Sequence, residues 1–134
     1  MNSFSFYILL PLLVTNIYVS MPDFLKNNKR YYTPVEYVFD KIGGTYKMPI
    51  LWRLKDKSWR FSELKRSISH ISDRMLSKNL KELVDDGFAT KAIIPEVPVK
   101  TEYTITEKGK RAIPIIVSLR NYGFQLMQED GIKD

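Results

Sequence analysis

The chain has 134 residues, which favours a single domain. Lysine and arginine number 21 against 15 aspartate and glutamate, and the resulting formal charge of +6 favours an anionic partner such as nucleic acid or an acidic membrane. The sequence contains no cysteine and one histidine, which excludes disulfides, a cysteine-ligated zinc site and thiol chemistry, and argues against a histidine-based metal site.

The first 20 residues, MNSFSFYILLPLLVTNIYVS, carry no charged side chain and are mostly apolar. They lack the basic start and the cleavage site of a secretory signal. The apolar run is interrupted by Pro11 and is shorter than the roughly 20 residues that a membrane-spanning helix needs. We interpret Met21 as the natural start and the leader as translated upstream sequence, with a membrane anchor and an additional dimer-packing segment as the alternatives. Residues 1–30 are thus predicted to be an apolar leader and a flexible polar segment outside the fold, and residues 31–130 to form the domain.

Two amphipathic helices are predicted at the start of this domain. In YYTPVEYVFDKIGG the apolar residues recur at i, i+3, i+4 and i+7, which is the spacing of one helix face. Pro34 suits the first turn of this helix, and Gly43 with Gly44 suits its end. The stretch KMPILWRLKD predicts a second helix whose Ile50 and Leu54 point inward.

The middle of the chain predicts a helix pair joined by a turn. SWRFSELKRSI is interpreted as a short extended piece at Trp59–Phe61 and a third helix capped by Ser62. SHISDRMLSKNLKELVDDG predicts a turn and a fourth helix, with Ser72 as the N-cap and Gly87 at the end.

Two strands and a long helix complete the predicted domain. FATKAIIPE and VKTEYTIT read as strands, and Pro95 and Pro98 stiffen the loop between them. Thr106 is the predicted N-cap of the last helix, EKGKRAIPIIVSLRNYGFQLMQ, with a kink expected at Pro114. A helix-turn-helix followed by a two-stranded hairpin defines a winged helix-turn-helix, which is a mainly α fold with a small β-hairpin (α+β).

The fourth helix carries two stripes of side chains. One stripe is apolar and anchors the helix to the core, while the other presents hydrogen-bond donors at i, i+3, i+4 and i+7. Such a helix can lie in the major groove, where arginine bonds guanine through two parallel donors and lysine or serine reaches base edges or phosphates. An ordinary solvated face is the alternative. The predicted DNA-binding residues of this helix and its cap are Ser72, Arg74, Ser77, Lys78 and Lys81.

The hairpin supplies a second set of candidates. Lys91 and Lys100 are predicted to lie on or near a rigid projection, the wing, and to contact phosphates. Arg60, ahead of the third helix, is a third candidate for a phosphate contact. The alternative is that the prolines of the wing merely protect the edges of the sheet.

The blocks PVEYVFDKIGG, ILWRL, RFSELKRSI, ISDRMLSKNLKELVDDG and PEVPVKTEYTITEKG together resemble the HxlR-type transcriptional regulators. The resemblance extends from about Thr33 to about Met127, with the blocks in family order and spacing. Many relatives carry a cysteine at the position of Thr33, and some use it to sense oxidants or electrophiles, so this chain lacks that sensor. Relatives also often have Gly-Gly-Lys-Trp where this chain has Gly-Gly-Thr-Tyr at residues 43–46, which puts a contact near the dimer interface in doubt.

The resemblance implies a repressor or activator that binds a palindromic operator as a homodimer built from the first and last helices. This implication accounts for more apolar residues on those helices than one small core needs. The predicted dimerisation residues are Val35, Val38, Phe39 and Ile42 on the first helix, and Ile116, Leu119, Tyr122 and Leu126 on the last.

The sequence therefore predicts a cytoplasmic, sequence-specific regulator whose partners are double-stranded DNA and a second copy of itself, with room for a small-molecule effector. No catalytic triad, phosphate-binding glycine loop or metal motif occurs, so we expect no enzymatic activity, cofactor or metal. Two alternatives stay open: a basic winged-helix protein-interaction module, and a membrane-anchored sensor if residues 1–20 are retained. The donors Arg74, Lys78 and Lys81 favour DNA.

Overall fold

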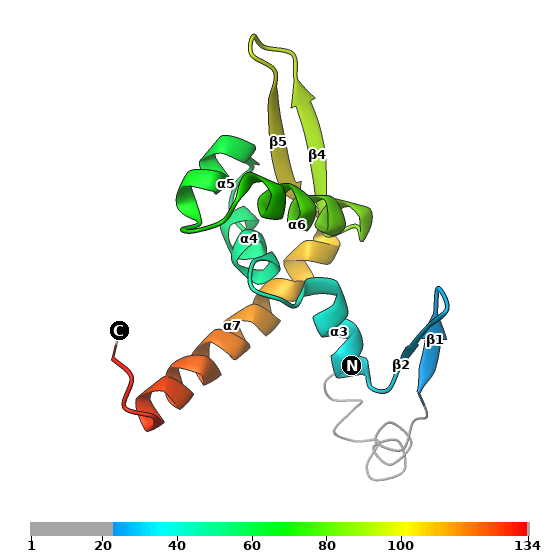
Figure 1. The fold of residues 1–134 in the computed structure, drawn as a ribbon, viewed down its shortest axis with the longest axis vertical. Helices are drawn as coiled ribbons and strands as arrows, with labels where there is room; N and C mark the ends of the chain where they lie inside the picture. The colour runs from blue at the N-terminus through cyan, green and yellow to red at the C-terminus, as the bar shows by residue number, and fades with distance from the viewer. Residues whose placement is uncertain (1–22, 134) are drawn as a thin grey trace, which may run out of the picture. The chain divides into compact units, whose positions relative to one another are not determined.

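The computed structural model describes residues 23–133 (Figure 1). The three interpretations of residues 1–20 therefore lie outside the described residues. Within residues 23–133, no helix is long and apolar enough to cross a membrane. The chain divides into two compact units, of which the first ends at Asp40 and the second begins at Lys41.

The first unit contains a β-hairpin where the sequence predicts a flexible segment. Strand β1 (Phe24–Lys26) pairs antiparallel with β2 (Lys29–Tyr31). Asn27 and Asn28 form the turn with φ angles of 51° and 65°, which suits the two-residue turns of tight hairpins. The rings of Phe24 and Tyr31 stack with centroids 5.2 Å apart. The sequence assigns residues 24–30 to a flexible segment outside the fold, whereas the structure pairs them in two short strands joined by this turn and supported by the ring stacking.

Helix α3 (Pro34–Ile42) follows the hairpin and begins and ends where the sequence predicts. Thr33 caps it, since the Thr33 Oγ1 accepts the Glu36 N–H at 3.0 Å. The Tyr31 hydroxyl donates to Asp40 Oδ2 at 2.5 Å, and this hydrogen bond raises the pKa of Tyr31 to about 12. The hydrogen bond ties β2 to the C-terminal half of α3 within the first unit.

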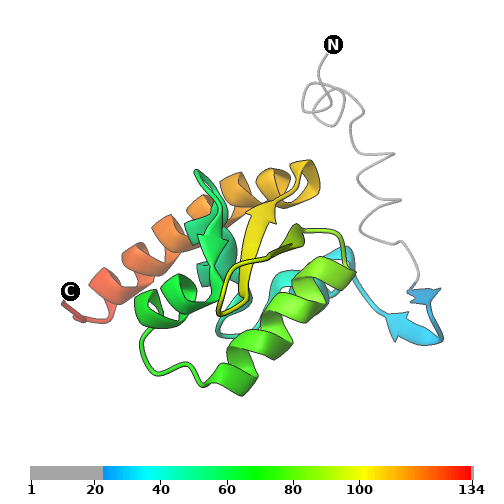
Figure 2. The same ribbon diagram turned by 90° about the horizontal axis from the view of Figure 1, so that it is seen from above.

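The second unit has the predicted winged helix-turn-helix order (Figure 1). Its helices are α4 (Lys47–Leu54), α5 (Phe61–Ser67), α6 (Asp73–Asp85) and α7 (Glu107–Glu129). Its strands are β3 (Trp59–Arg60), β4 (Ala89–Ile94) and β5 (Lys100–Ile105), which form an antiparallel sheet in the order β3-β5-β4. Seen from above in Figure 2, α6 and α7 lie on opposite sides of the β4–β5 hairpin, which projects away from both helices in Figure 1. This unit is the mainly α fold with a small sheet that the sequence predicts.

The core of the second unit lies between α4, α5 and α6. Burying one leucine or isoleucine side chain stabilises a fold by roughly 1.5–3 kcal/mol, so these side chains dominate the packing. The fully buried ones are Ile50, Leu51, Leu54, Leu64, Leu76, Leu80 and Leu83. Ala112 and Ile116 add the N-terminal half of α7 to this core.

Capping side chains fix the starts of the two longest helices. Ser72 Oγ accepts the Met75 N–H at 3.1 Å, and Thr106 Oγ1 accepts the Gly109 N–H at 3.1 Å, which confirms both predicted N-caps. The predicted cap of α5 is wrong, because the helix begins at Phe61 and Ser62 lies within its first turn. The Arg60 N–H instead donates to the Glu63 carboxylate at 3.0 Å, so this carboxylate, three residues further along the chain, caps the start of α5.

Gly109 allows α7 to approach the chain before β4 closely. A Cβ atom at this position would lie 2.3 Å from the Phe88 carbonyl oxygen and 2.6 Å from Ile105 Cγ1. Gly109→Ala should therefore lower the free energy of unfolding by about 1–3 kcal/mol, because overpacking outweighs the helix preference of alanine. Urea unfolding followed by circular dichroism measures this change.

Gly123, in the same helix, is the matched control. A Cβ atom there would meet nothing within 4 Å. Gly123→Ala should raise the free energy of unfolding by about 0.5–1 kcal/mol, which is the ordinary gain for a helical glycine whose added methyl group meets no neighbour. An equal gain from Gly109→Ala would contradict the close approach of α7 to Phe88.

Candidate nucleic-acid interface

Helix α6 presents a buried face and a polar face. Leu76, Leu80 and Leu83 are fully buried, so they fix the rotation of the helix about its axis. The side chains of Arg74, Ser77, Lys78 and Lys81 are exposed on the polar face. The structure thus brings together the four helical donors that the sequence singles out, and it directs them away from the core.

The donors of α6 differ in what they contact. Within the described residues, neither Arg74 nor Lys78 forms an ion pair with a carboxylate. Lys81 Nζ lies 2.6 Å from Asp85 Oδ2, and this hydrogen bond raises the pKa of Lys81. Ser72 uses an oxygen lone pair for the N-cap, which leaves its hydroxyl hydrogen for another acceptor. Arg74 and Lys78 are therefore the cations with the fewest competing contacts.

The turn between α5 and α6 is held by contacts from the preceding helices. Lys65 Nζ donates to the Ile71 carbonyl oxygen at 2.7 Å and lies 3.9 Å from Asp73 Oδ1. His70, within the turn, adopts a φ of 63°, a left-handed conformation that reverses the chain direction over few residues. These contacts fix the entry of the chain into α6.

A second anchor joins α4 to the far half of α6. Lys47 is 7% exposed, and its Nζ lies 2.7 Å from Glu82 Oε2. An ion pair with one buried partner costs several kcal/mol when the other partner is removed, so it holds the two helices in one register. The position of α6 is therefore fixed at both ends.

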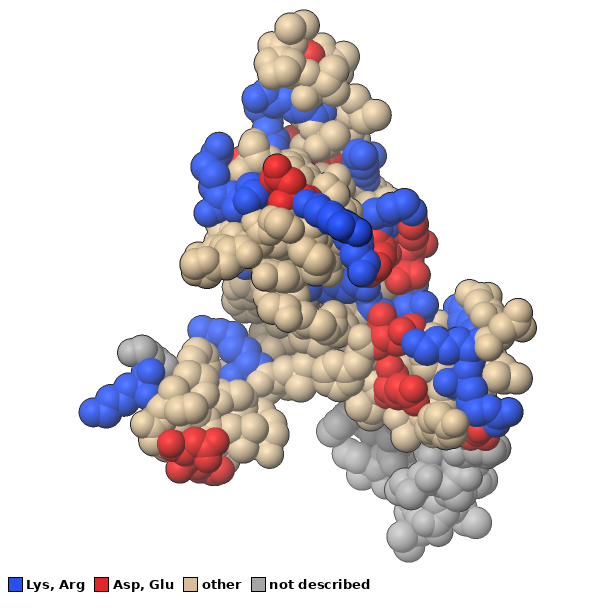
Figure 3. Space-filling view, viewed as in Figure 1, with Lys and Arg blue, Asp and Glu red and all other residues tan. Residues whose placement is uncertain are grey.

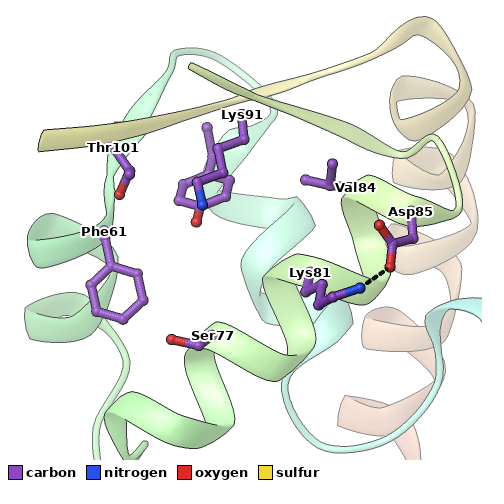
Figure 4. A pocket seen from close by; sticks show the side chains of 8 residues that line it. Phe61, Ser77, Lys81, Val84, Asp85, Lys91 and Thr101 are labelled. Atoms are coloured by element: carbon purple, nitrogen blue, oxygen red, sulfur yellow. Dashed lines mark hydrogen bonds and ion pairs between the residues drawn. The ribbon is translucent and has the colours of Figure 1, made fainter. Parts of the chain in front are cut away.

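A groove of about 510 Å³ separates α6 from the wing (Figure 4). Ser77 and Lys81 line it from α6, and Lys91 and Thr101 line it from β4 and β5. Figure 4 shows Lys91 directed from its strand into this groove. Ammonium groups thus stand on both walls of the groove, and the Asp85 carboxylate that pairs with Lys81 also lines it. Thr101 was not among the sequence candidates, since only the strand register shows that it shares a face with Lys91.

The two wing lysines lie on opposite faces of the hairpin. Lys91 pairs directly with Tyr103, and Lys100 pairs with Ile94. Because successive side chains of a strand alternate between faces, the pair that includes Lys91 and the pair that includes Lys100 face opposite ways. One phosphate cannot serve both lysines.

Lys100 instead lies beside the start of α5. It lines a hollow of about 220 Å³ together with Arg60, Ser62 and Val99. Arg60 lies 3.8 Å from the Glu96 carboxylate, so its charge is partly neutralised. Lys100 has no ion pair within the described residues, which makes it the freer cation of this hollow.

The tip of the wing is not cationic. The turn between β4 and β5 spans residues 95–99, with Glu96 exposed and Val97 fully exposed. Figure 3 shows Lys and Arg side chains over α5, α6 and the wing up to just below its tip, interrupted by acidic groups, whereas the tip itself is largely uncharged. Phosphate contacts are therefore available from the strands of the wing, where Lys91 and Lys100 lie, rather than from the turn at its tip.

A buried three-helix core, an exposed cationic helix and a β-wing define the class of winged helix-turn-helix proteins. Residues 41–131 match the family described as HxlR-like helix-turn-helix. The match covers more than half of the chain, and the chain belongs to this family.

Relatives of known class agree with this membership. An HTH-type transcriptional regulator of Methanothermobacter thermautotrophicus is 44% identical over 93 residues, covering 69% of this chain and 71% of the relative. The HTH-type transcriptional regulator YdzF of Bacillus subtilis is 38% identical over 91 residues, covering 67% and 84% of the two chains. The structure of the redox regulator HypR in its oxidised form superposes with a TM-score of 0.64 at 36% identity, covering 69% and 95%. Since the present chain has no cysteine, it contains no thiol for a redox response.

Proposed function

We propose that the protein is a sequence-specific DNA-binding transcriptional regulator of the cytoplasm that acts as a homodimer on a palindromic operator. The single observation that carries this proposal is the polar face of α6, with Arg74, Ser77, Lys78 and Lys81 exposed opposite a fully buried leucine face. A recognition helix requires this combination of a fixed axis and free donors. No feature of the described residues supports a reaction, and we propose no enzymatic activity.

The candidate residues divide by the part of DNA that they can reach. Arg74, Ser77 and Lys78 lie in the N-terminal half of α6 and are assigned to base edges, because that half of a recognition helix enters the major groove most deeply. The remaining candidates are assigned to phosphates. These are Arg60, Ser72, Lys81, Lys91 and Lys100.

The dimer is assigned partly to an apolar stripe on α7. Ile115, Leu119, Tyr122 and Leu126 are spaced by four, three and four residues, and all four side chains are exposed. This spacing places them on one helix face, as in helix pairs that pack along a seam. Ile116, which the sequence assigns to dimerisation, is 7% exposed and already lies in the protomer core. Ile115 takes its place in the proposed stripe.

Helix α3 offers a second apolar surface. Val35 and Phe39 are exposed, and Val38 is half-buried. Ile42 is only 3% exposed, so it has almost no surface left for a partner. A homodimer that covers the α3 surface and the α7 stripe would also place two copies of α6 about a two-fold axis, as a palindromic operator requires.

A basic protein-interaction module is the alternative function. It gives no reason for Arg74 and Lys78 to stand on one helix face without carboxylate partners. Selecting binding sites for the full chain from random double-stranded oligonucleotides separates the two functions. We expect two-fold symmetric sites with half-site centres roughly 34 Å, or about 10 base pairs, apart. A failure to enrich any sequence would refute the proposed function.

A further inference from the structure

A groove of about 400 Å³ lies between α4 and α7, away from the candidate DNA-binding residues. Its apolar wall consists of Met48 and Trp52 from α4 and of Ile116 and Leu119 from α7. Volumes of this size with mainly apolar walls and a few polar groups are typical of sites for small molecules. The groove belongs wholly to the second unit.

The polar groups of this groove are two guanidinium groups. Arg53 and Arg120 line it, and no aspartate or glutamate does. Arg120 forms no ion pair within the described residues, and its guanidinium carbon lies 4.7 Å from the centroid of the Phe124 ring. Arg53 donates only to neutral oxygens, namely the Pro49 carbonyl and the hydroxyl and carbonyl of Ser67. The groove therefore combines an apolar wall with positive charge that no carboxylate of its lining neutralises.

We propose that this groove binds a small organic carboxylate with an apolar ring. The ring would lie against Trp52, Met48 and Ile116, and the carboxylate would accept hydrogen bonds from Arg120 and from the free donors of Arg53. Planar guanidinium groups suit carboxylates because two parallel N–H donors match the two oxygens. A neutral ring compound would leave both charges without a partner, and an inorganic anion would leave the apolar wall in water.

Arg53 connects the groove to the helix-turn-helix. Its Nε lies 2.5 Å from Ser67 Oγ, and its Nη2 lies 3.0 Å from the Ser67 carbonyl oxygen. Ser67 is the last residue of α5, directly before the turn that leads into α6. A carboxylate that draws Arg53 into the groove would weaken these two contacts and shift the end of α5. Occupancy of the groove would thus change DNA affinity, a consequence that rests on the proposed function.

Titrating the full chain with benzoate tests the site without DNA. Tryptophan fluorescence should change on binding, with a dissociation constant of about 1 mM or below. Trp52→Phe should abolish the signal, because the remaining Trp59 does not line the groove. Arg120→Gln, a change at an exposed position, should weaken binding about tenfold. Benzamide should bind at least about tenfold more weakly than benzoate because it lacks the charge, and inorganic phosphate should bind at least about tenfold more weakly because it lacks the apolar ring.

The outcomes distinguish this site from the proposed function. Absence of a benzoate signal in the wild-type chain, or equal binding of benzamide, would overturn the site. Benzoate binding that Arg120→Gln leaves unchanged would also overturn it. Arg53→Lys keeps the charge but loses the forked contact with Ser67, so benzoate should still bind while its effect on operator affinity disappears. If the protein binds benzoate but enriches no DNA sequence, the proposed binding site stands and the proposed regulatory function is refuted.

Discussion

Arg74→Ala is expected to weaken binding to a cognate operator by about 1–3 kcal/mol and to relax the preference at one base-pair position. Arg74 lies in the first turn of α6, is exposed and has no carboxylate partner within the described residues. Its removal leaves the buried face of α6 unchanged, so the loss reports on DNA contact rather than on folding. Fluorescence anisotropy with the operator and with single-base variants measures both effects.

Lys100→Ala provides the contrast for this prediction. Lys100 is the first residue of β5, next to the turn at the tip of the wing, lines a hollow beside the start of α5 and is assigned to a phosphate. Its removal should weaken binding to all sequences alike and reduce the salt dependence by about one charge. Equal losses on all sequences from both variants would refute the division of roles between the helix and the wing.

The sequence could predict those parts of the fold whose signals are local. The apolar spacing in α6 gives its buried face, and the hydroxyls of Ser72 and Thr106 give the helix starts, because a cap bonds an N–H only three residues away. The donor stripe follows from the same periodicity. Four of the candidate DNA-binding residues could therefore be assigned to one exposed face without coordinates.

Other features depend on contacts between distant parts of the chain. The register of β4 and β5 decides that Lys91 and Lys100 face opposite ways, and a single-residue slip between the strands would place both lysines on one face. The rotation of α7 against α4 decides that Ile116 is buried while Ile115 is exposed. The sequence contains both isoleucines side by side, and periodicity along a uniformly apolar stretch does not choose between them.

The β1–β2 hairpin could not be predicted from the sequence for a different reason. Its strands are three residues long and largely exposed, so they lack the alternating apolar pattern by which strands are recognised. Its order comes from the turn at Asn27 and Asn28 and from the stacking of Phe24 on Tyr31. Polar composition alone therefore suggested flexibility where specific contacts are present.

Leu126→Glu is expected to convert the protein into a monomer and to abolish high-affinity operator binding. Leu126 lies on the exposed stripe of α7 with Leu119 and Tyr122, and it lines neither the core nor the α4–α7 groove. In a two-fold dimer the substitution would place two unpaired carboxylates in one interface, at a cost of about 3–5 kcal/mol for each charge left without a partner. Sedimentation and operator titration measure the two consequences.

The folded protomer should survive this substitution, since the side chain at position 126 is exposed before any partner binds. Gln125→Glu is the matched control, because it adds the same charge at the preceding residue of α7, which is exposed and does not belong to the stripe. It should leave both the dimer and the operator affinity intact. A dimeric Leu126→Glu protein would move the interface off α7, whereas a monomer with unchanged operator affinity would separate DNA binding from dimerisation. If Leu126→Glu loses both dimerisation and operator binding while Gln125→Glu keeps both, the stripe must form the contact between two DNA-bound copies.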